Sequence, residues 1–327
     1  MPKAVRFHEF GGPEVLKIED VSIRKPGPDE VAIDVLAVGL NRGESVYFHG
    51  QYVEHAQFPS GLGYEAVGTV TSVGPNVENT LIGKRVGTIP GYSMNRYGAT
   101  GEKAIIPANL VAELPASLSD AESAAVWMQY ATSYGALVEL GNVGPGDFVI
   151  VTAASSSVGL AAIQIIKAQG GTSIAATRTS RKRQQLLDLG ANYVIVTEEE
   201  DLPTRVSEIT EGKLARIVLD PVGGDYVNVL AQATAKEGTI FLYGMLSGKP
   251  TPYPMAGFTK GVALTAYVMS QMHVPERLDK MKRYIYDRLA DGTFKPQIDR
   301  TFQFSEIVQA YQYLESNQHV GKVVVTV

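Results

Sequence analysis

The sequence predicts an α/β protein in which a doubly wound parallel sheet is joined to a second, β-rich domain. Residues 148–268 alternate short apolar, β-branched runs with segments of helical periodicity. That alternation is typical of a parallel sheet whose strands are connected by right-handed helical crossovers. Residues 1 to about 120 instead contain short strand-like runs separated by clusters of Gly, Pro and Asn, which indicates a small barrel.

The amino-acid composition limits which classes of protein are possible. The chain has 327 residues, of which 45% are hydrophobic and 19% charged, so about two domains with ordinary cores are expected. The formal net charge of −5 makes a nucleic-acid or membrane-surface role unfavourable, because such roles need a basic face. The sequence contains no cysteine, which excludes disulfides and thiolate zinc sites.

Histidine usage and hydropathy give two further expectations. The five histidines lie far apart and show no metal-ligand spacing. The N-terminus has no apolar signal core, and no apolar run is long enough to span a bilayer. We therefore expect a soluble, cytoplasmic protein that holds no metal.

The first domain combines short strands with one long connection. Strand-like runs cover residues 15–21, 30–37, 68–73 and 85–88. Residues 39–63 form a connection with polar and aromatic side chains, and long ordered loops are often functional. Ser119 begins a helix, because its hydroxyl can cap and acids follow in the first turn. This helix is expected to continue to Leu140 with a break near Tyr130.

The second domain continues as alternating strands and helices. Strands are predicted at residues 148–152, 173–177, 193–196, 216–219, 239–243 and 262–268. Helices are predicted at residues 160–168, 181–189, 203–210, 227–235 and 276–289. After them, residues 294–302 are expected to be extended and to return to the first domain, before a helix at 305–316 and a strand at 323–327.

The turn after the strand at 148–152 is the first candidate for a binding site. A dinucleotide fold needs small residues there, because the backbone approaches a pyrophosphate at a helix N-terminus. Ala154, Ser156 and Gly159 occupy the positions of the usual GxGxxG pattern, so only the last glycine is present. The turn alone is equally compatible with a tight strand–helix connection in any α/β domain.

The end of the next strand indicates which cofactor is bound. An NAD site usually has Asp or Glu there, about 20 residues beyond the glycine turn. Residues 177–183 read TRTSRKR and contain no acid. Their cations and hydroxyls suit a 2′-phosphate, so we expect NADPH at Thr177, Arg178, Ser180, Arg181 and Lys182. The alternative is a solvated basic helix start, although cations oppose the helix dipole at that position.

Several motifs together resemble a known family. They are Lys3-Ala4-Val5, Phe10-Gly11-Gly12-Pro13, Val38-Gly39-Leu40-Asn41, the run from Gly61 to Gly68, the run from Ala153 to Gly159, Leu189-Gly190-Ala191, the run from Asp220 to Gly224 and Val320-Gly321-Lys322-Val323-Val324. Across nearly the whole chain they resemble the zinc-lacking medium-chain dehydrogenase/reductases, in the quinone oxidoreductase or zeta-crystallin-like group.

The resemblance implies a fold, a domain division and a cofactor site. It implies a GroES-like catalytic domain from residues 1–124 and 265–327, around a Rossmann NADP-binding domain at 125–264. At the family's metal-ligand positions the chain has Asn41-Arg42 and Tyr64, and we expect Glu65 to be a buried, turn-stabilising acid. The cofactor residues expected beyond the basic run are Gln129, Thr132, Ser156, Ser157, Val158, Gly159, Gly244 and Lys322.

The resemblance also implies hydride transfer to a small molecule without zinc. A quinone or an α,β-unsaturated carbonyl is a suitable acceptor, because charge develops on an oxygen that neutral donors can stabilise. Asn41 and Tyr52 resemble residues that line the family's cleft, and Tyr47 is close in sequence. The proton donor stays open between a tyrosine and water, and either tyrosine is also compatible with a simple rim position.

Two other functions and one assembly state are also considered. The first alternative is an NADPH-dependent ketone or alcohol oxidoreductase of the same fold. The second is a non-enzymatic cofactor- or RNA-binding protein, as in zeta-crystallin-like relatives. We further expect a homodimer that pairs through residues 262–268, because an apolar edge strand invites pairing.

Overall fold

The computed structural model describes all residues, 1–327, and divides into two compact units. The first consists of residues 1–128 and 295–327, and the second of residues 129–294. Compared with the division expected from sequence, the second unit extends beyond residue 264. Helix α9 (Pro275–Ala290) explains this extension, because its Tyr284 accepts a hydrogen bond from Gln169 at 2.8 Å within that unit. The ring of Phe294, beyond α9, stacks on Tyr130 at 4.7 Å.

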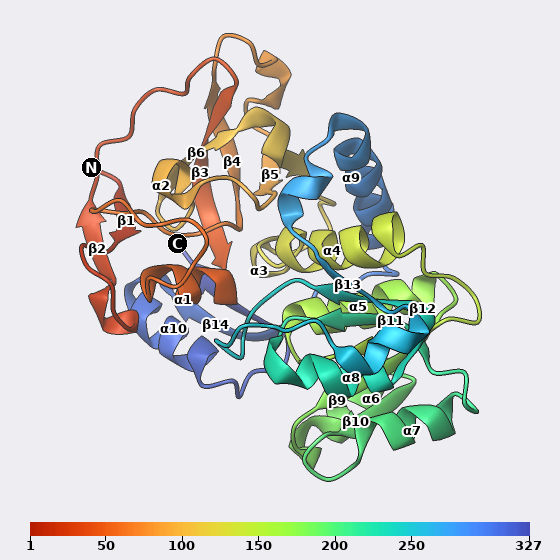
Figure 1. The fold of residues 1–327 in the computed structure, drawn as a ribbon. Coiled ribbons are helices and arrows are strands. Elements are labelled where there is room, and N and C mark those ends of the chain that lie inside the picture. The colour runs from red at the N-terminus through yellow and green to blue at the C-terminus, as the bar shows by residue number, and fades with distance from the viewer. The chain divides into compact units, whose positions relative to one another are not determined.

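A six-stranded, wholly parallel sheet forms the centre of the second unit (Figure 1). Its order is β10-β9-β8-β11-β12-β13, which is the doubly wound order with a switch point between β8 and β11. The strands are β8 (Phe148–Val151), β9 (Thr172–Thr177), β10 (Tyr193–Val196), β11 (Ala215–Asp220), β12 (Thr234–Leu242) and β13 (Ala263–Ala266). This sheet confirms the predicted Rossmann fold.

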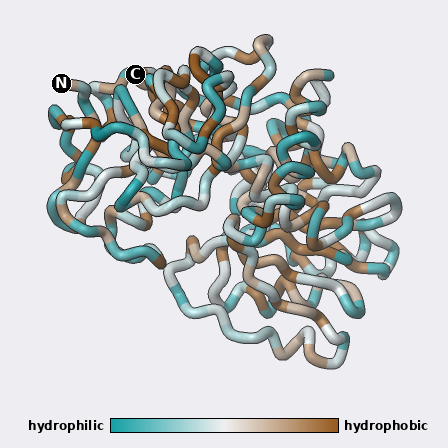
Figure 2. Tube along the Cα trace, turned by 90° about the horizontal axis from the view of Figure 1, so that it is seen from above, coloured by the Kyte–Doolittle hydropathy of each residue, from teal (hydrophilic) through white to brown (hydrophobic).

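Helices cover this sheet and bury its apolar residues. They are α4 (Trp127–Tyr134, whose first two residues belong to the first unit), the π-helical turn η4 (Gly135–Leu140), α5 (Ser157–Ala168), η5 (Ser180–Lys182), α6 (Arg183–Asp188), α7 (Leu202–Ile209), η6 (Gly224–Tyr226), α8 (Val227–Gln232), η7 (Met255–Lys260), η8 (Met269–Met272) and α9. Ile150, Ile174, Ile195 and Val218 on the strands are fully buried and form a core with the helices. Figure 2 shows the hydropathy of each residue along the chain, with the hydrophobic stretches in brown.

The first unit contains a seven-stranded sheet of mostly antiparallel strands (Figure 1). Its strands are β3 (Glu30–Gly39), β4 (Ala66–Val73), β5 (Arg85–Thr88), β6 (Lys103–Pro107), β7 (Val111–Glu113), β14 (Ile298–Gln303) and β15 (Lys322–Thr326). A separate hairpin pairs β1 (Lys3–Arg6) with β2 (Lys17–Asp20). The parallel pairing of β14 with β15 confirms that the chain returns to this domain after the Rossmann sheet.

Short helices complete the first unit. They are η1 (Pro13–Val15), α1 (Arg42–Phe48), η2 (Asn79–Leu81), α2 (Met94–Tyr97), η3 (Ala108–Leu110), α3 (Asp120–Ser123), η9 (Phe304–Glu306) and α10 (Ile307–Glu315). Helix α1 lies where we expected a long connection at 39–63, and the sequence signal for it is a capping box. Asn41 accepts from the third helical N–H, and Glu44 accepts the N–H of Asn41 at 2.9 Å.

The predicted helix from Ser119 to Leu140 is wrong in the position of its break. The interruption lies between α3 and α4, at residues 124–126, and not near Tyr130. The Glu65 carboxylate explains the new start, because it accepts the Met128 N–H at 2.9 Å at the beginning of α4. A helix needs such partners for its first N–H groups. Here the partner is distant in sequence, so local patterns do not reveal it.

Candidate functional site

The turn between β8 and α5 has the geometry of an anion-binding turn. Ser156 is the N-cap of α5, and its hydroxyl accepts the Gly159 N–H at 3.1 Å. The cap leaves the N–H groups of Ser157 and Val158 at the helix N-terminus, where backbone donors and the dipole favour an anion. Ala153, which opens the turn, has a left-handed φ of 46°, a conformation uncommon for a residue other than glycine.

Gly159 is required at its position by close packing. A Cβ there would lie 2.5 Å from the carbonyl oxygen of Ala154. This is the role of the third glycine of a dinucleotide fingerprint, which lets the helix pack closely on the strand end. The two serines therefore leave the helix packing of the fingerprint intact, and the Ser156 hydroxyl supplies the helix cap.

The basic run after β9 reaches the turn after β8. Lys182 places its Nζ 3.1 Å from the hydroxyl of Ser155. The predicted contact of Lys182 with a 2′-phosphate stays a prediction. Thr177 ends β9 and is half-buried. Three further donors follow it and are exposed, namely Arg178, Ser180 and Arg181.

One neighbouring cation does not belong to this group. Arg183 forms an ion pair with Glu200 at 3.2 Å and donates to the carbonyl of Val194. Its guanidinium is therefore engaged by the protein itself. This difference separates Arg183 from Arg178 and Arg181, and it makes Arg183 a natural control position.

Strand β12 contributes to the same carboxyl edge of the sheet. Gly244 follows it, and a Cβ there would lie 2.9 Å from the carbonyl oxygen of Pro221. Tyr243 has a buried hydroxyl without a hydrogen-bond partner of good geometry, and it faces Ser156 in the turn. Burial raises the pKa of Tyr243, so the hydroxyl stays protonated and remains a donor. The orphaned hydroxyl, the capped helix N-terminus and the cations together fit a dinucleotide phosphate.

Helix α4 packs on α5 beside this turn. Ser133 donates to the carbonyl of Val158 at 3.1 Å, and Tyr130 donates to Gln164 at 3.0 Å. The two predicted cofactor residues of α4, Gln129 and Thr132, are both buried. Their predicted contact with a cofactor stays a prediction.

In the first unit, Asn41 lies in a buried polar network. Lys322 donates to its Oδ1 at 2.6 Å, which fixes the orientation of the amide because an ammonium group needs an acceptor. The Asn41 amide group then donates to the Gly39 carbonyl at 2.9 Å and to Glu44 at 3.1 Å. Both amide hydrogens are therefore occupied within the protein. A contact between Asn41 and a substrate needs a rearrangement of these bonds.

Lys322 and Glu65 form a buried ion pair. Their side chains are 1% and 0% exposed. Burial raises the pKa of Glu65, and the Lys322 ammonium and the N–H of Met128 oppose that rise. Glu65 therefore has the structural role expected from the sequence. Lys322 has the same role here, and its predicted cofactor contact stays a prediction.

The two tyrosines named from the sequence differ in accessibility. Tyr47 is 1% exposed, and its hydroxyl contacts Ser60 at 2.7 Å and Asn95 at 2.8 Å. It thereby connects α1 to the segment around α2. Tyr52 is half-buried, and its ring lies 6.3 Å from that of Tyr64, centroid to centroid. Of the three predicted catalytic side chains, Asn41 and Tyr47 are buried and only Tyr52 is half-buried.

The family's metal-ligand positions hold side chains that are already engaged. Asn41 belongs to the network with Lys322, and Tyr64 packs between Tyr52 and Tyr92. The structure contains no group of three or more His, Cys, Asp or Glu side chains that could hold a metal ion. The expectation that the protein works without a metal stays a prediction.

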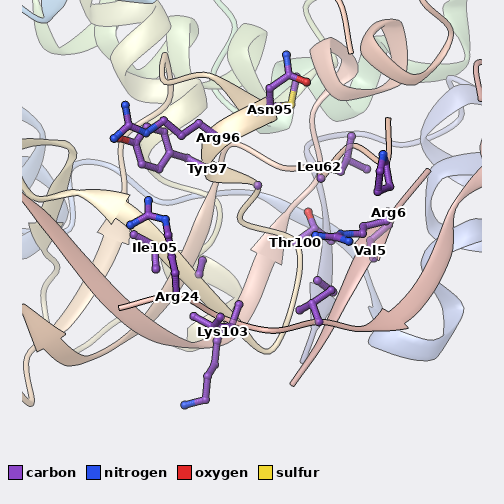
Figure 3. Close-up of a pocket in the computed structure, with 18 of the residues that line it drawn as sticks. Val5, Arg6, Arg24, Leu62, Asn95, Arg96, Tyr97, Thr100, Lys103 and Ile105 are labelled. Atoms are coloured by element: carbon purple, nitrogen blue, oxygen red, sulfur yellow. The ribbon is translucent and has the colours of Figure 1, made fainter. Parts of the chain in front are cut away.

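A pocket of about 320 Å³ lies elsewhere in the first unit (Figure 3). None of the predicted catalytic residues lines it. Three of its four cations are already paired, since Glu30 binds Arg24 and Arg96, and Asp34 binds Lys103; the fourth is Arg6. An anionic substrate would have to compete with these carboxylates, so we do not assign the reaction to this pocket.

Comparison with known proteins agrees with this geometry. Residues 27–116 match the alcohol dehydrogenase GroES-like domain, and residues 157–283 match the zinc-binding dehydrogenase family model. A quinone oxidoreductase of Pseudomonas aeruginosa is 30% identical over 99% of both chains. The chain belongs to the quinone oxidoreductase group of the medium-chain dehydrogenase/reductases. No helix of this family member is long and apolar enough to cross a membrane.

Solved structures extend the family comparison. Escherichia coli quinone oxidoreductase in complex with NADPH has a TM-score of 0.91 and 29% identity, covering 99% of this chain and 100% of that one. An NAD-dependent alcohol dehydrogenase has a TM-score of 0.88 and 30% identity over 99% of both chains. Both structures therefore share the fold of the present chain over nearly its whole length.

Sequence reasoning missed three residues of these two regions. Ser155 and Tyr243 lie at the anion-binding turn, and Glu44 binds Asn41. The spacing Asn41-x-x-Glu44 is a capping-box signal that was available in the sequence. The other two depend on contacts between segments that are distant in the chain.

Proposed function

We propose that the protein is an NADPH-dependent reductase that transfers hydride to quinones or to α,β-unsaturated carbonyls. The observation that carries the cofactor assignment is the acid-free basic run after β9, with Lys182 in contact with the turn at the N-terminus of α5. A 2′-phosphate needs charge-assisted donors, and this run supplies them. The relative in Escherichia coli, whose structure contains NADPH, supports the same assignment.

In this proposal, one group of residues binds the cofactor and another residue stabilises the reacting substrate. When bound, NADPH supplies the hydride. The N–H groups of Ser157 and Val158, with Lys182, hold its phosphates in our proposal. Tyr52 is the neutral donor that stabilises negative charge on the acceptor oxygen. A conjugated acceptor spreads that charge over several atoms, so it needs less Lewis-acid assistance than an isolated ketone.

A panel of acceptors tests this function. The oxidation of NADPH and NADH is followed by absorbance with a quinone, an enone and the saturated ketone that corresponds to the enone. We expect NADPH to be oxidised with the quinone or the enone, and the saturated ketone to be at least tenfold slower. Equal rates on the enone and the saturated ketone would support a carbonyl reductase instead.

One observation favours a second candidate. The structural likeness to an NAD-dependent alcohol dehydrogenase is as close in identity as the likeness to the quinone oxidoreductases. A ketone or alcohol oxidoreductase on this fold is therefore the alternative. Two observations argue against this alternative. No acid follows β9 to bind the ribose of NAD, and Asn41 and Tyr64 occupy the positions of the family's metal ligands.

We also propose that the protein is a homodimer and acts in the cytoplasm. Strand β13 is an edge of the Rossmann sheet and pairs only with β12. Large hydrophobic side chains are exposed in the segments before and after it, namely Met245, Leu246, Tyr253, Met255, Phe258 and Val268. Exposed apolar clusters of this kind indicate an interaction surface, and a second copy of the same edge is a symmetric partner.

A further inference from the structure

The segment of residues 52–59 has no backbone support of its own, since none of these residues forms a backbone–backbone hydrogen bond. The chain on either side is fixed. Gln51 donates to a carbonyl of α1 at 3.0 Å, and Ser60 exchanges two backbone hydrogen bonds with Phe7. A segment without its own backbone bonds opens easily unless other groups hold it. This one carries Tyr52, the neutral donor of the proposed reaction.

The amide of Asn95 holds the middle of this segment. Its Oδ1 accepts the Gln57 N–H at 2.7 Å, and its Nδ2 donates to the His55 carbonyl at 2.8 Å. The two backbone partners fix which amide atom is the oxygen, because an N–H group only donates and a carbonyl only accepts. The same Nδ2 also donates to the Glu54 carboxylate at 3.1 Å.

Glu54 joins the segment to the beginning of α2. Its carboxylate accepts the Met94 N–H at 3.0 Å and the hydroxyl of Ser93. All the hydrogen bonds of residues 53–59 therefore go to Ser93, Met94 and Asn95. The position of the segment depends on these three residues.

Helix α2 is itself fixed to the sheet of the first unit. Arg96 and Tyr97, which follow Asn95 on α2 (Figure 3), donate to the Glu30 carboxylate at 3.2 and 2.9 Å. Glu30 begins β3. Helix α2 therefore connects the segment of residues 52–59 to a strand in the sheet.

Asn95 also acts on Tyr52 through a neighbouring ring. The Tyr47 hydroxyl donates to the Oδ1 of Asn95 at 2.8 Å. The ring of Tyr47 meets that of Tyr52 edge-on, with 6.1 Å between centroids and an interplanar angle of 87°. Asn95 thus constrains Tyr52 in two ways, along the chain through Glu54 and through the ring of Tyr47.

We propose that Asn95 is a positioning residue, which holds residues 52–59 in place and thereby keeps Tyr52 at the substrate. The inference rests on the proposed reductase function, in which Tyr52 stabilises the acceptor oxygen. Asn95 itself does not contact the reacting atoms. None of the predicted cofactor residues is hydrogen-bonded to it, so its role concerns turnover and not the binding of NADPH.

Asn95→Asp replaces only the amide nitrogen with oxygen. The donor to the His55 carbonyl is lost, and the new carboxylate faces that of Glu54. We expect kcat with a quinone to fall about 10-fold or more, because a small misplacement of a reacting group is costly. Hydrogen–deuterium exchange of residues 51–60 should rise. The Kd for NADPH, measured by quenching of protein fluorescence, should not change.

A second substitution separates positioning from a general loss of stability. Glu54→Gln, added to Asn95→Asp, reverses the pair, because the amide now lies on residue 54 and the carboxylate on residue 95. Two residues in contact are energetically coupled, so we expect the double variant to recover at least about 3-fold of the lost kcat. Its exchange in residues 51–60 should fall back toward that of the unaltered protein.

Asn76→Asp is the matched control. Asn76 also donates its amide to a carboxylate, that of Asp29 at 3.0 Å, but it lies in an exposed turn. This change should alter neither kcat, nor the exchange of residues 51–60, nor the Kd for NADPH.

Three results would overturn the inference. They are full kcat or unchanged exchange in Asn95→Asp, parallel losses of kcat and NADPH affinity in that variant, and a double variant no more active than Asn95→Asp. If the unaltered protein binds NADPH but reduces no acceptor, the proposed function fails and the catalytic part of the inference fails with it. The exchange measurement then still decides whether Asn95 holds the segment.

Discussion

The buried ion pair of Lys322 and Glu65 shows how single residues set the stability of the first unit. Both charges lie away from water, so each relies on the other and on local hydrogen bonds. Lys322 also orients Asn41, and Glu65 caps α4 through the Met128 N–H. One lysine therefore supports three segments that are far apart in the sequence.

Lys322→Met should destabilise the protein strongly. The change leaves the Glu65 carboxylate buried without its cation, which costs about 3–5 kcal/mol. Lys103→Met is the matched control, because the pair of Lys103 with Asp34 is 42% and 48% exposed and such pairs contribute less than about 1 kcal/mol. The two free energies of unfolding are compared by denaturant titration. Similar losses for both variants would show that the buried pair has no special role.

The donors after β9 should govern cofactor choice. In Thr177→Asp with Arg178→Ala, the new carboxylate repels a 2′-phosphate and one donor is lost. We expect KM for NADPH to rise by about 10-fold or more and kcat to stay nearly constant, which is the pattern of lost uniform binding. KM for NADH should fall or stay level. Steady-state kinetics with both cofactors give these values.

A neighbouring arginine provides the control for that experiment. Arg183→Gln removes a cation that is already paired with Glu200, so KM for NADPH should not change. A rise equal to that of the double variant would show that general positive charge, and not a built phosphate site, attracts the cofactor. Parallel losses with NADH and NADPH would indicate damage to the fold.

Asn41 shows the limit of sequence reasoning for a single residue. Its position in the motif Val38-Gly39-Leu40-Asn41 suggested a catalytic donor. Whether its amide hydrogens are available depends on Glu44 and Lys322, and Lys322 lies 281 residues away. A long-range partner of this kind has no local signature. The catalytic role of Asn41 therefore stays a prediction.

At the level of elements, Glu30 joins three segments of the first unit. It begins β3 and accepts hydrogen bonds from Arg24 and from the Gly27 N–H in the preceding loop. It also accepts from Arg96 at 3.2 Å and from Tyr97 at 2.9 Å, both on α2. These interactions, led by Arg24, lower the pKa of Glu30 to about 2.

The stability of the protein should depend on this carboxylate at low pH. Because the pKa of Glu30 is about 2 in the folded state and 4.5 is the ordinary value of a glutamate, the folded state favours the ionised form. The contribution is fully present above pH 4.5 and decreases as the pH falls toward 2. Glu30→Gln should remove this part of the pH dependence and cost about 1–3 kcal/mol at neutral pH. Thermal unfolding at several pH values measures it, and an unchanged acid profile would contradict the assignment.

Elements with strong local patterns could be predicted, and those defined by distant partners could not. Strand β10 has the predicted bounds, and α5 and α9 differ from their predictions by at most a few residues, because apolar periodicity defines them. The break between α3 and α4 was misplaced because its cause is the Glu65 carboxylate. The contact of Lys182 with Ser155 also joins two separate turns, so the sequence indicated both turns without their contact.

At the level of the whole molecule, the edge of the Rossmann sheet should determine assembly. Sedimentation at micromolar concentration should show a dimer. Val268→Asp places a charge among the exposed apolar residues around β13, where Val268 is 54% exposed, and should shift the protein toward monomer. Leu187→Asp, on α6 and 36% exposed, is the control and should leave the dimer intact. A monomeric unaltered protein would remove the basis of this prediction.

The central claim is that this Rossmann unit selects NADPH through cations that replace the usual acid after β9. Its most direct test is the ratio of kcat/KM for NADPH to that for NADH, measured with one quinone at one salt concentration. Each well-placed donor to a 2′-phosphate contributes about 1.5–3 kcal/mol, so the account predicts a ratio of about 10 to 100 or more. A ratio of one or less would contradict it.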